Sequence, residues 1–285
     1  MAQPAFFPIA QPEVLNSRRI CGGIRRLPEP TLQQLAVRNH HHPSITIILA
    51  TRNSAQFLRQ ALESIWEQQE PAVEVIVMDG ASTDGTLRLL HAANDQIDYW
   101  ASEPDRGVYD AWNKGLQEAR GEWIGFLGSD DRLLPGALHA YREVIRQTDP
   151  ELEYLSSRAR RPDPSGNAKI FGQPWEWSNF RRWMTVAHPG SLHHRSLFAK
   201  LGNFKASYRS AGDYELLLRA GDTLRAGYLH RVTVSMQPGG ISDSTLSLRE
   251  TFQAQLQTHS LGFFAAVCER AVATAKFYGR RAIHP

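Results

Sequence analysis

Cysteine is scarce in this sequence, with only Cys21 and Cys268 among 285 residues. Two cysteines so far apart along the chain provide neither a disulfide framework nor the short spacing of a metal site. The N-terminus also lacks the basic segment followed by an apolar run that is typical of a signal peptide. We therefore expect a protein of the reducing cytoplasm.

Long hydrophobic runs and a strong charge of one sign are absent too. No apolar segment approaches the length of a bilayer-spanning helix, so any membrane contact is expected to be peripheral, at the inner face of the membrane. The net charge of +3 is too small to indicate a nucleic-acid partner. Neither G-x-G-x-x-G after the first strand nor G-x-x-x-x-G-K-S/T occurs, which disfavours a dinucleotide-binding dehydrogenase and a P-loop NTPase.

From residue 43 the chain alternates between short apolar runs and helical patterns. The predicted strands are residues 44–50, 73–78, 97–101 and 123–127. The predicted helices between them are residues 57–66, 86–90 and 108–119. This alternation predicts right-handed βαβ crossovers, and therefore an α/β protein with a mostly parallel sheet flanked by helices.

Polar residues follow these strands at the carboxyl edge of the predicted sheet, where ligands bind in open α/β folds. Among them, Asp130 and Asp131 are adjacent carboxylates. Such hard oxygen ligands suit Mg²⁺ or Mn²⁺, which bind through one or two carboxylates together with substrate phosphates. Taken alone, the pair is better explained as a solvated loop in which Asp131 caps a helix. Acids, hydroxyls and an arginine at four strand ends nevertheless predict a nucleotide-sized polar site.

Four segments resemble the family 2 glycosyltransferases of bacterial polysaccharide biosynthesis, in the family's order. They are residues 51–53, 77–86, 103–115 and 121–131. The resemblance is dense over residues 43–135 and patchier to about residue 242. It implies the Rossmann-like GT-A fold and an inverting transfer from a UDP- or GDP-linked sugar to a hydroxyl of a saccharide or a lipid-linked acceptor. The Q-x-x-R-W signature of processive synthases is absent, so transfer of a single sugar is expected.

The same resemblance implies a nucleotide-sugar site at the first strand ends. Thr51, Arg52 and Asn53 match the turn after the opening strand. Asp79 matches the acid that reads the base or the ribose, although a turn-forming aspartate is the alternative for this position. Arg106 matches a basic position that faces the diphosphate, and a surface arginine is the alternative.

Asp130 and Asp131 match the D-x-D region of the family, in which Gly128 replaces the first acid. The resemblance implies a Mn²⁺ or Mg²⁺ site here that neutralises charge on the departing nucleoside diphosphate. We assign the metal and a donor contact to Asp130, with Asp131 as a second ligand or a ribose contact. Which of the two acids holds the metal stays open.

Asp213 precedes an apolar helical run and resembles the acidic motif that carries the family's catalytic base. An acceptor hydroxyl must lose a proton as it attacks, and a carboxylate can take it. A plain helix cap is the alternative for Asp213, and Glu215 is the competing base. His188 is a candidate acceptor or supporting contact, or a packed histidine. Trp183 belongs either to a sugar-binding rim or to ordinary packing.

We divide the chain into an N-terminal extension, partly ordered at best (1–42), a GT-A domain (43–242) and a C-terminal helical tail (243–285). The tail is expected to form one or two helices with an apolar face and a basic end. Such a tail can lie on a membrane, pack back on the domain or mediate a homodimer.

Two other functions remain open at this point. A sugar-nucleotide nucleotidyltransferase would use a related sheet, but no glycine- and arginine-rich phosphate loop follows the first strand. A non-catalytic nucleotide-binding or scaffolding relative would bind nucleotide without turnover, and the retained acids argue against it.

Overall fold

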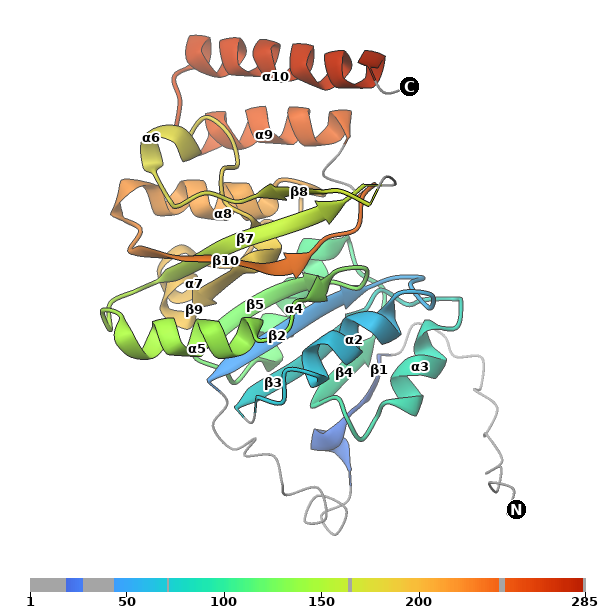
Figure 1. The fold of residues 1–285 in the computed structure, drawn as a ribbon. Coiled ribbons are helices and arrows are strands. Elements are labelled where there is room, and N and C mark those ends of the chain that lie inside the picture. The colour runs from blue at the N-terminus through green and yellow to red at the C-terminus, as the bar shows by residue number, and fades with distance from the viewer. Residues whose placement is uncertain (1–18, 28–43, 71, 164–165, 241–243, 284–285) are drawn as a thin grey trace, which may run out of the picture.

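The computed structural model describes residues 19–27, 44–70, 72–163, 166–240 and 244–283. Its strands are β1 (Ile20–Gly22), β2 (Ile45–Thr51), β3 (Val73–Asp79), β4 (Tyr99–Ser102), β5 (Trp123–Gly128), β6 (Arg132–Leu133), β7 (Tyr154–Pro162), β8 (Ala168–Phe171), β9 (Ser191–His194) and β10 (Ala226–Ser235). Within these ranges they form one sheet in the order β1-β4-β3-β2-β5-β9-β7-β10-β6, and β8 pairs with β7 (Figure 1).

The helices are α2 (Leu58–Trp66), α3 (Thr86–Ala92), α4 (Val108–Glu118), α5 (Ala137–Gln147), α6 (Trp177–Phe180), α7 (Arg195–Leu201), α8 (Gly212–Ala220), α9 (Thr245–Gln257) and α10 (Phe263–Ile283). One hydrophobic core packs α2, α3 and α5 against the sheet, and a second packs α4, α7 and α8 against it. Helices on both sides of a sheet confirm the predicted α/β class.

The strands β4, β3, β2 and β5 are parallel to one another, as the alternating pattern predicts. Every residue of β3 is buried, and six of the seven residues of β2 are buried as well. A strand covered on both faces has a continuous apolar sequence, which is why these strands are visible in the sequence. Because these four strands are parallel, their carboxyl ends lie along one edge of the sheet.

The second half of the sheet is mixed, and the sequence analysis did not identify most of its strands. β9 is antiparallel to both β5 and β7, whereas β10 is parallel to β7. The strands β8 and β10 contain many exposed or half-buried residues. They therefore lack the apolar runs that mark buried strands.

Regular structure begins earlier than the predicted start at residue 43. β1 adds an antiparallel strand to the outer edge of β4. The guanidinium of Arg19 forms a 2.7 Å ion pair with Glu118, and Arg25 pairs with Glu74. These cations therefore bind the domain itself. A strand of three residues has no periodicity from which it could be recognised. The rest of the predicted extension, 1–18 and 28–42, lies outside the described residues.

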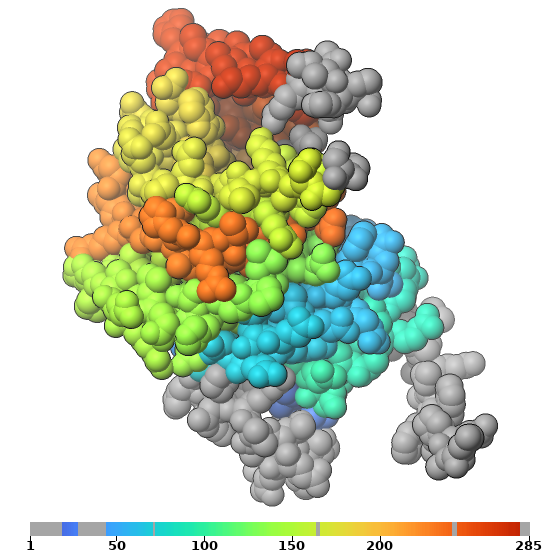
Figure 2. All heavy atoms as spheres, viewed as in Figure 1, coloured from blue at the N-terminus to red at the C-terminus, as the bar shows by residue number. Residues whose placement is uncertain are grey.

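The C-terminal tail forms two helices, α9 and α10. Figure 1 shows α9 and α10 above the sheet in succession, with α10 outermost, and α9 contacts α8. Figure 2 shows α10 in red at one end of the molecular surface, near the yellow segment. Within the described ranges, no helix has both the length and the apolar character needed to cross a bilayer.

Candidate functional site

The polar strand ends predicted from the sequence lie along one edge of the sheet. Thr51 at the end of β2 is in register with Asp79 at the end of β3, and Asp79 is in register with Ser102 at the end of β4. On the other side of β2, the hydroxyl of Ser129 donates a 2.9 Å hydrogen bond to the hydroxyl of Ser54. Four strand ends therefore contribute to a single polar edge, as expected.

Asp79 is held rigidly at this edge. Its Oδ2 accepts hydrogen bonds from the backbone N–H of Ser82 at 3.0 Å and from the hydroxyl of Ser102 at 2.6 Å, and its Oδ1 accepts one from the Ser82 hydroxyl. Only 2% of Asp79 is exposed. The two serines were not among the predicted site residues. The register of β3 and β4 brings Ser102 to Asp79, and the turn after β3 brings Ser82 there.

The turn after β2 joins the turn after β3. Asn53 adopts a left-handed conformation with φ of 51°, and its Oδ1 accepts a 2.8 Å hydrogen bond from the backbone of Thr83. The neighbouring Arg52 is exposed, whereas Thr51 is buried with a hydroxyl that has no partner among the described residues. The strand ends therefore present the buried hydroxyl of Thr51 and the exposed side chain of Arg52.

Arg106 lies on the surface just before α4. Three quarters of its side chain is exposed, and its guanidinium forms a 3.1 Å ion pair with Asp110 in the first turn of α4. The same carboxylate accepts a 3.0 Å hydrogen bond from the Arg106 backbone. An exposed arginine tethered to its own helix is available to a ligand at this edge.

Asp130 and Asp131 converge on the space above Gly128. A Cβ placed on Gly128 would lie 2.8 Å from Oδ1 of Asp130 and 3.1 Å from Oδ2 of Asp131. Burial, followed by the neighbouring charge of Asp130, raises the pKa of Asp131 to about 7. Two facing carboxylates, one of them deprived of solvent, are stabilised by a bound cation. The residues therefore fit a divalent metal, and the missing side chain of Gly128 provides the room.

Asp213 lies in the first turn of α8, next to the start of α4. Its Oδ1 accepts a 2.9 Å hydrogen bond from the phenol of Tyr109 and another of 2.9 Å from the backbone of Tyr214. Burial raises the pKa of Asp213, and the hydrogen bond from Tyr109 opposes that rise. One oxygen is thus fixed while Oδ2 carries no hydrogen bond among the described residues, and the raised pKa favours proton uptake.

His188 packs directly behind Asp213. Only 4% of it is exposed, and its ring stacks on Trp112 with a centroid separation of 5.2 Å. Burial lowers the pKa of His188 to about 3, so the ring is neutral near Oδ2 of Asp213, which lies 3.8 Å away. His188 therefore lies beneath the carboxylate of Asp213, in a position to support it.

Glu215, the competing base, has a different environment. It is fully buried and forms ion pairs with Lys205 at 2.7 Å and with Arg219 at 3.2 Å. A fully buried carboxylate held by two cations has no open side from which an acceptor hydroxyl could reach it. The geometry therefore favours Asp213 over Glu215.

The tail reaches into this region through Glu250 on α9. Its carboxylate accepts hydrogen bonds from the backbone N–H groups of Arg209, Ser210 and Ala211, at 2.7 to 3.1 Å. These residues form the loop that leads into α8 and Asp213. Sequence patterns gave no indication of this contact because Glu250 lies forty positions away, in a helix with no motif.

Trp183 lies apart from the strand ends. It lines a cavity of about 300 Å³ formed by residues 182–184, α9 and α10. The guanidinium carbon of Arg182 and the ammonium of Lys276 lie 5.0 and 5.6 Å from the centre of its indole ring. Trp183 is therefore a feature of the junction between the domain and its tail.

The comparisons with known proteins agree with this architecture. The family model Glycosyl transferase family 2 matches residues 46–209, more than half of the chain. The PGL/p-HBAD biosynthesis glycosyltransferase of Mycobacterium bovis is 30% identical over 210 residues, which cover 71% of this chain and 80% of the relative. An uncharacterized glycosyltransferase of Mycobacterium tuberculosis is 30% identical over 189 residues, covering 62% of this chain and 69% of the relative.

Solved structures share the fold at lower identity. S. aureus TarS 1-349 in complex with UDP-GlcNAc superposes with a TM-score of 0.62 at 18% identity; the alignment covers 75% of this chain and 65% of that one. The mannosyltransferase PcManGT from Pyrobaculum calidifontis, in complex with GDP-Man and Mn²⁺, gives a TM-score of 0.58 at 21% identity, covering 86% and 81%. The expected GT-A fold is confirmed. Sequence and fold together show that this chain belongs to glycosyl transferase family 2.

Proposed function

We propose that this glycosyltransferase moves one sugar from a UDP- or GDP-linked donor to an acceptor hydroxyl, with inversion at the anomeric carbon. Membership of the family favours glycosyl transfer over nucleotidyl transfer and over a purely scaffolding role. The solved relatives that carry UDP-GlcNAc, or GDP-Man with Mn²⁺, support a nucleotide-sugar donor. The absence of the Q-x-x-R-W signature supports release after a single transfer.

The observation that carries the proposal is the state of Asp213. Its Oδ1 is held by Tyr109 and by the backbone of Tyr214, and burial raises its pKa. In the proposed step, the acceptor hydroxyl gives its proton to Asp213 and its oxygen forms the new bond to the anomeric carbon. The bond from that carbon to the nucleoside diphosphate breaks on the opposite face, and its electron pair leaves with the diphosphate.

The donor is proposed to lie along the polar edge of the sheet. Thr51, Arg52 and Asn53 would contact the nucleotide, with the buried Thr51 hydroxyl as an available partner. Asp79 would act with its serine partners to shape the base or ribose contact, and Arg106 would bind the diphosphate after leaving Asp110.

Asp130 and Asp131 would hold Mn²⁺ or Mg²⁺ above Gly128, with Asp130 also in contact with the donor. Such a cation supplies electrostatic stabilisation of charge on the leaving diphosphate. The acceptor, a saccharide or a lipid-linked sugar, would approach Asp213, with His188 beneath it. The division of the chain at residues 42 and 242 stays part of this proposal, although Glu250 ties the tail to the acceptor side.

Two measurements test the proposal together. Calorimetric binding of nucleoside diphosphates with and without Mn²⁺ should give metal-dependent binding of one nucleotide, and Asp130→Ala should abolish it. Asp213→Asn should lose transfer while it keeps that binding, because Asp213 acts only in the chemical step. Transfer that survives in Asp213→Asn would remove Asp213 as the base. Failure of every nucleotide to bind would contradict the donor site.

A further inference from the structure

The outward face of α10 carries an apolar stripe that nothing in the transfer reaction uses. The stripe consists of Phe264, Val267, Cys268, Ala271, Ala275 and Tyr278, all of them exposed. Their spacing of three and four residues places them on one side of the helix. Phe264 is 84% exposed and Tyr278 is 58% exposed. Large side chains gathered this openly on one helix face mark an interaction surface.

The opposite side of α10 packs against the protein. Ala266 and Phe277 are buried, and α10 lies on α9 as the outermost layer of the helical stack (Figure 1). The helix is therefore anchored along one face while the stripe points away from the sheet. Because the anchoring residues and the stripe lie on different sides, a partner can reach the stripe without unfolding the tail.

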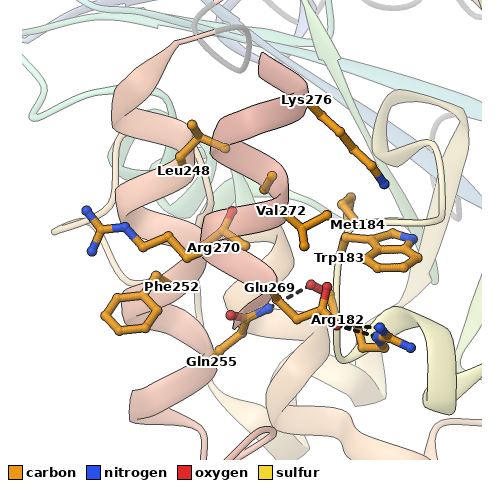
Figure 3. Close-up of a pocket in the computed structure, with 12 residues that line it drawn as sticks. Arg182, Trp183, Met184, Leu248, Phe252, Gln255, Glu269, Arg270, Val272 and Lys276 are labelled. Carbon is orange, nitrogen blue, oxygen red and sulfur yellow. Dashed lines mark hydrogen bonds and ion pairs between the residues drawn. The ribbon is translucent and has the colours of Figure 1, made fainter. Parts of the chain in front are cut away.

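Two basic side chains, Arg270 and Lys276, lie on either side of α10 between the stripe and the face that packs on α9, and both line the cavity beside Trp183. Arg270 reaches over the ring of Phe252 on α9, at 5.0 Å, and Lys276 lies 5.6 Å from the ring of Trp183 on the other side (Figure 3). The acid on this helix, Glu269, is engaged in an ion pair with Arg182 at 2.5 Å. An apolar stripe between two cationic edges matches the cross-section of an interfacial helix.

We propose that α10 docks on a membrane surface rich in anionic lipids, with the apolar stripe inserted at the headgroup boundary. Phe264, Val267 and Tyr278 would enter the interface, while Arg270 and Lys276 would meet the headgroups. Charge selects this occupant over a second copy of the chain. Because α10 carries these two cations and its acid Glu269 is already paired with Arg182, two copies paired through the stripe would bring like-charged helices together, which is unfavourable.

Docking of α10 would also bring Trp183 and the loop before Asp213 toward the membrane. Trp183, 43% exposed beside Lys276, would lie near the interface, where tryptophan is preferred. α9 connects α10 to the loop before Asp213 through Glu250. A docked α10 would therefore hold the acceptor side of the domain close to the lipid surface.

The direct test uses the two cysteines of the chain, which lie at opposite ends of the fold. An environment-sensitive fluorophore such as NBD is attached to Cys268 in a Cys21→Ser variant, and to Cys21 in a Cys268→Ser variant. With phosphatidylglycerol vesicles, the label at position 268 should shift to shorter wavelength, whereas the label at position 21 should not. The assay requires no donor or acceptor, so its result is independent of the proposed transfer reaction.

Vesicle co-sedimentation then tests the stripe with a matched control. Phe264→Glu should weaken binding to phosphatidylglycerol vesicles about tenfold or more, because it replaces a large apolar side chain at the lipid boundary with a charged one. Ile170→Glu alters a residue on β8 that is 55% exposed, and should bind as the wild type does. Phosphatidylcholine vesicles should bind weakly.

Three results would overturn the proposal. The first is absence of wild-type binding to anionic vesicles, and the second is equal binding by Phe264→Glu and the wild type. The third is a dimer in light scattering that Phe264→Glu dissociates, which would assign the stripe to a second copy of the chain.

Discussion

Tyr109 and Asp213 lie 104 positions apart in the sequence, yet the phenol of Tyr109 donates a 2.9 Å hydrogen bond to Oδ1 of Asp213. Tyr109 lies in the first turn of α4, and Asp213 lies in the first turn of α8. Only 3% of Tyr109 is exposed, so its ring is fixed by packing. The bond therefore fixes the direction in which the free oxygen of Asp213 points.

Tyr109→Phe should slow transfer and change its pH dependence. The hydrogen bond lowers the pKa of Asp213 against the effect of burial, so its removal should raise that pKa further. A smaller fraction of Asp213 is then ionised at neutral pH, and the acid limb of the kcat/KM profile should move to higher pH. The loss should be about tenfold or more, because a hydrogen bond to a charged group contributes about 1.5 to 3 kcal/mol.

Tyr208→Phe provides the matched control for this measurement. Tyr208 is also buried, but its phenol donates to Gln257 at 3.0 Å. Its substitution should leave the acid limb where it is in the wild type. Identical acid limbs in Tyr109→Phe and the wild type would show that Tyr109 does not act through Asp213.

Gly212→Ala should impair the same contact by a steric route. A Cβ at position 212 would lie 2.8 Å from two ring atoms of Tyr109, closer than real Cβ contacts allow. The ring must shift away from Asp213, so kcat should fall while the affinity for nucleoside diphosphate is retained. The double variant Gly212→Ala/Tyr109→Phe should lose less transition-state stabilisation than the sum of the losses in the two single variants, because both substitutions disturb the same contact. Additive losses would contradict the coupling.

The parallel half of the sheet could be predicted from the sequence because its strands are buried. Strands such as β2 and β3 are covered on both faces, and five of the seven residues in each are apolar. Once those strands are recognised, the parallel register brings Thr51 and Asp79 to one edge. The donor side of the candidate site could therefore be outlined before the structure was known.

The acceptor side could not be predicted in this way. Tyr109 binds Asp213, and Glu250 binds the loop before Asp213, through tertiary contacts between segments that carry no shared pattern. The sequence left His188 open as an acceptor or supporting contact or as a packed histidine, and its burial against Trp112 became visible only in the structure. Partly exposed strands such as β10 also lack a periodic signal.

Glu250→Gln should reduce transfer without reducing nucleotide affinity. Oε2 of Glu250 accepts hydrogen bonds from three successive backbone N–H groups of the loop before α8, and Oε1 accepts a second one from Arg209. Glutamine removes the negative charge and places an NH₂ donor against at least one of these backbone donors. The loop should loosen, so kcat should fall several-fold and amide exchange over residues 209–211 should accelerate. Glu122→Gln, an exposed carboxylate, is the control. Unchanged exchange in Glu250→Gln would contradict the proposed positioning.

Asp131→Asn should stabilise the metal-free protein at alkaline pH. Burial and the charge of Asp130 raise the pKa of Asp131 to about 7, whereas an unfolded aspartate ionises near 3.9. Between about pH 4 and pH 7 the folded protein therefore retains a proton that the unfolded chain releases. The free energy of unfolding should fall as pH rises through this window, by up to about 4 kcal/mol for a difference of about three pKa units.

Asparagine cannot ionise, so Asp131→Asn should lose this pH dependence. In thermal unfolding with EDTA, the variant should match the wild type near pH 4 and exceed it at pH 8. Asp130→Asn is the control, and it should give a smaller gain because it removes only the neighbouring charge. Addition of Mn²⁺ at pH 8 should stabilise the wild type and should stabilise Asp131→Asn much less. Parallel pH curves for the wild type and Asp131→Asn would show that Asp131 is ionised without a metal, and would remove the electrostatic reason for a cation above Gly128.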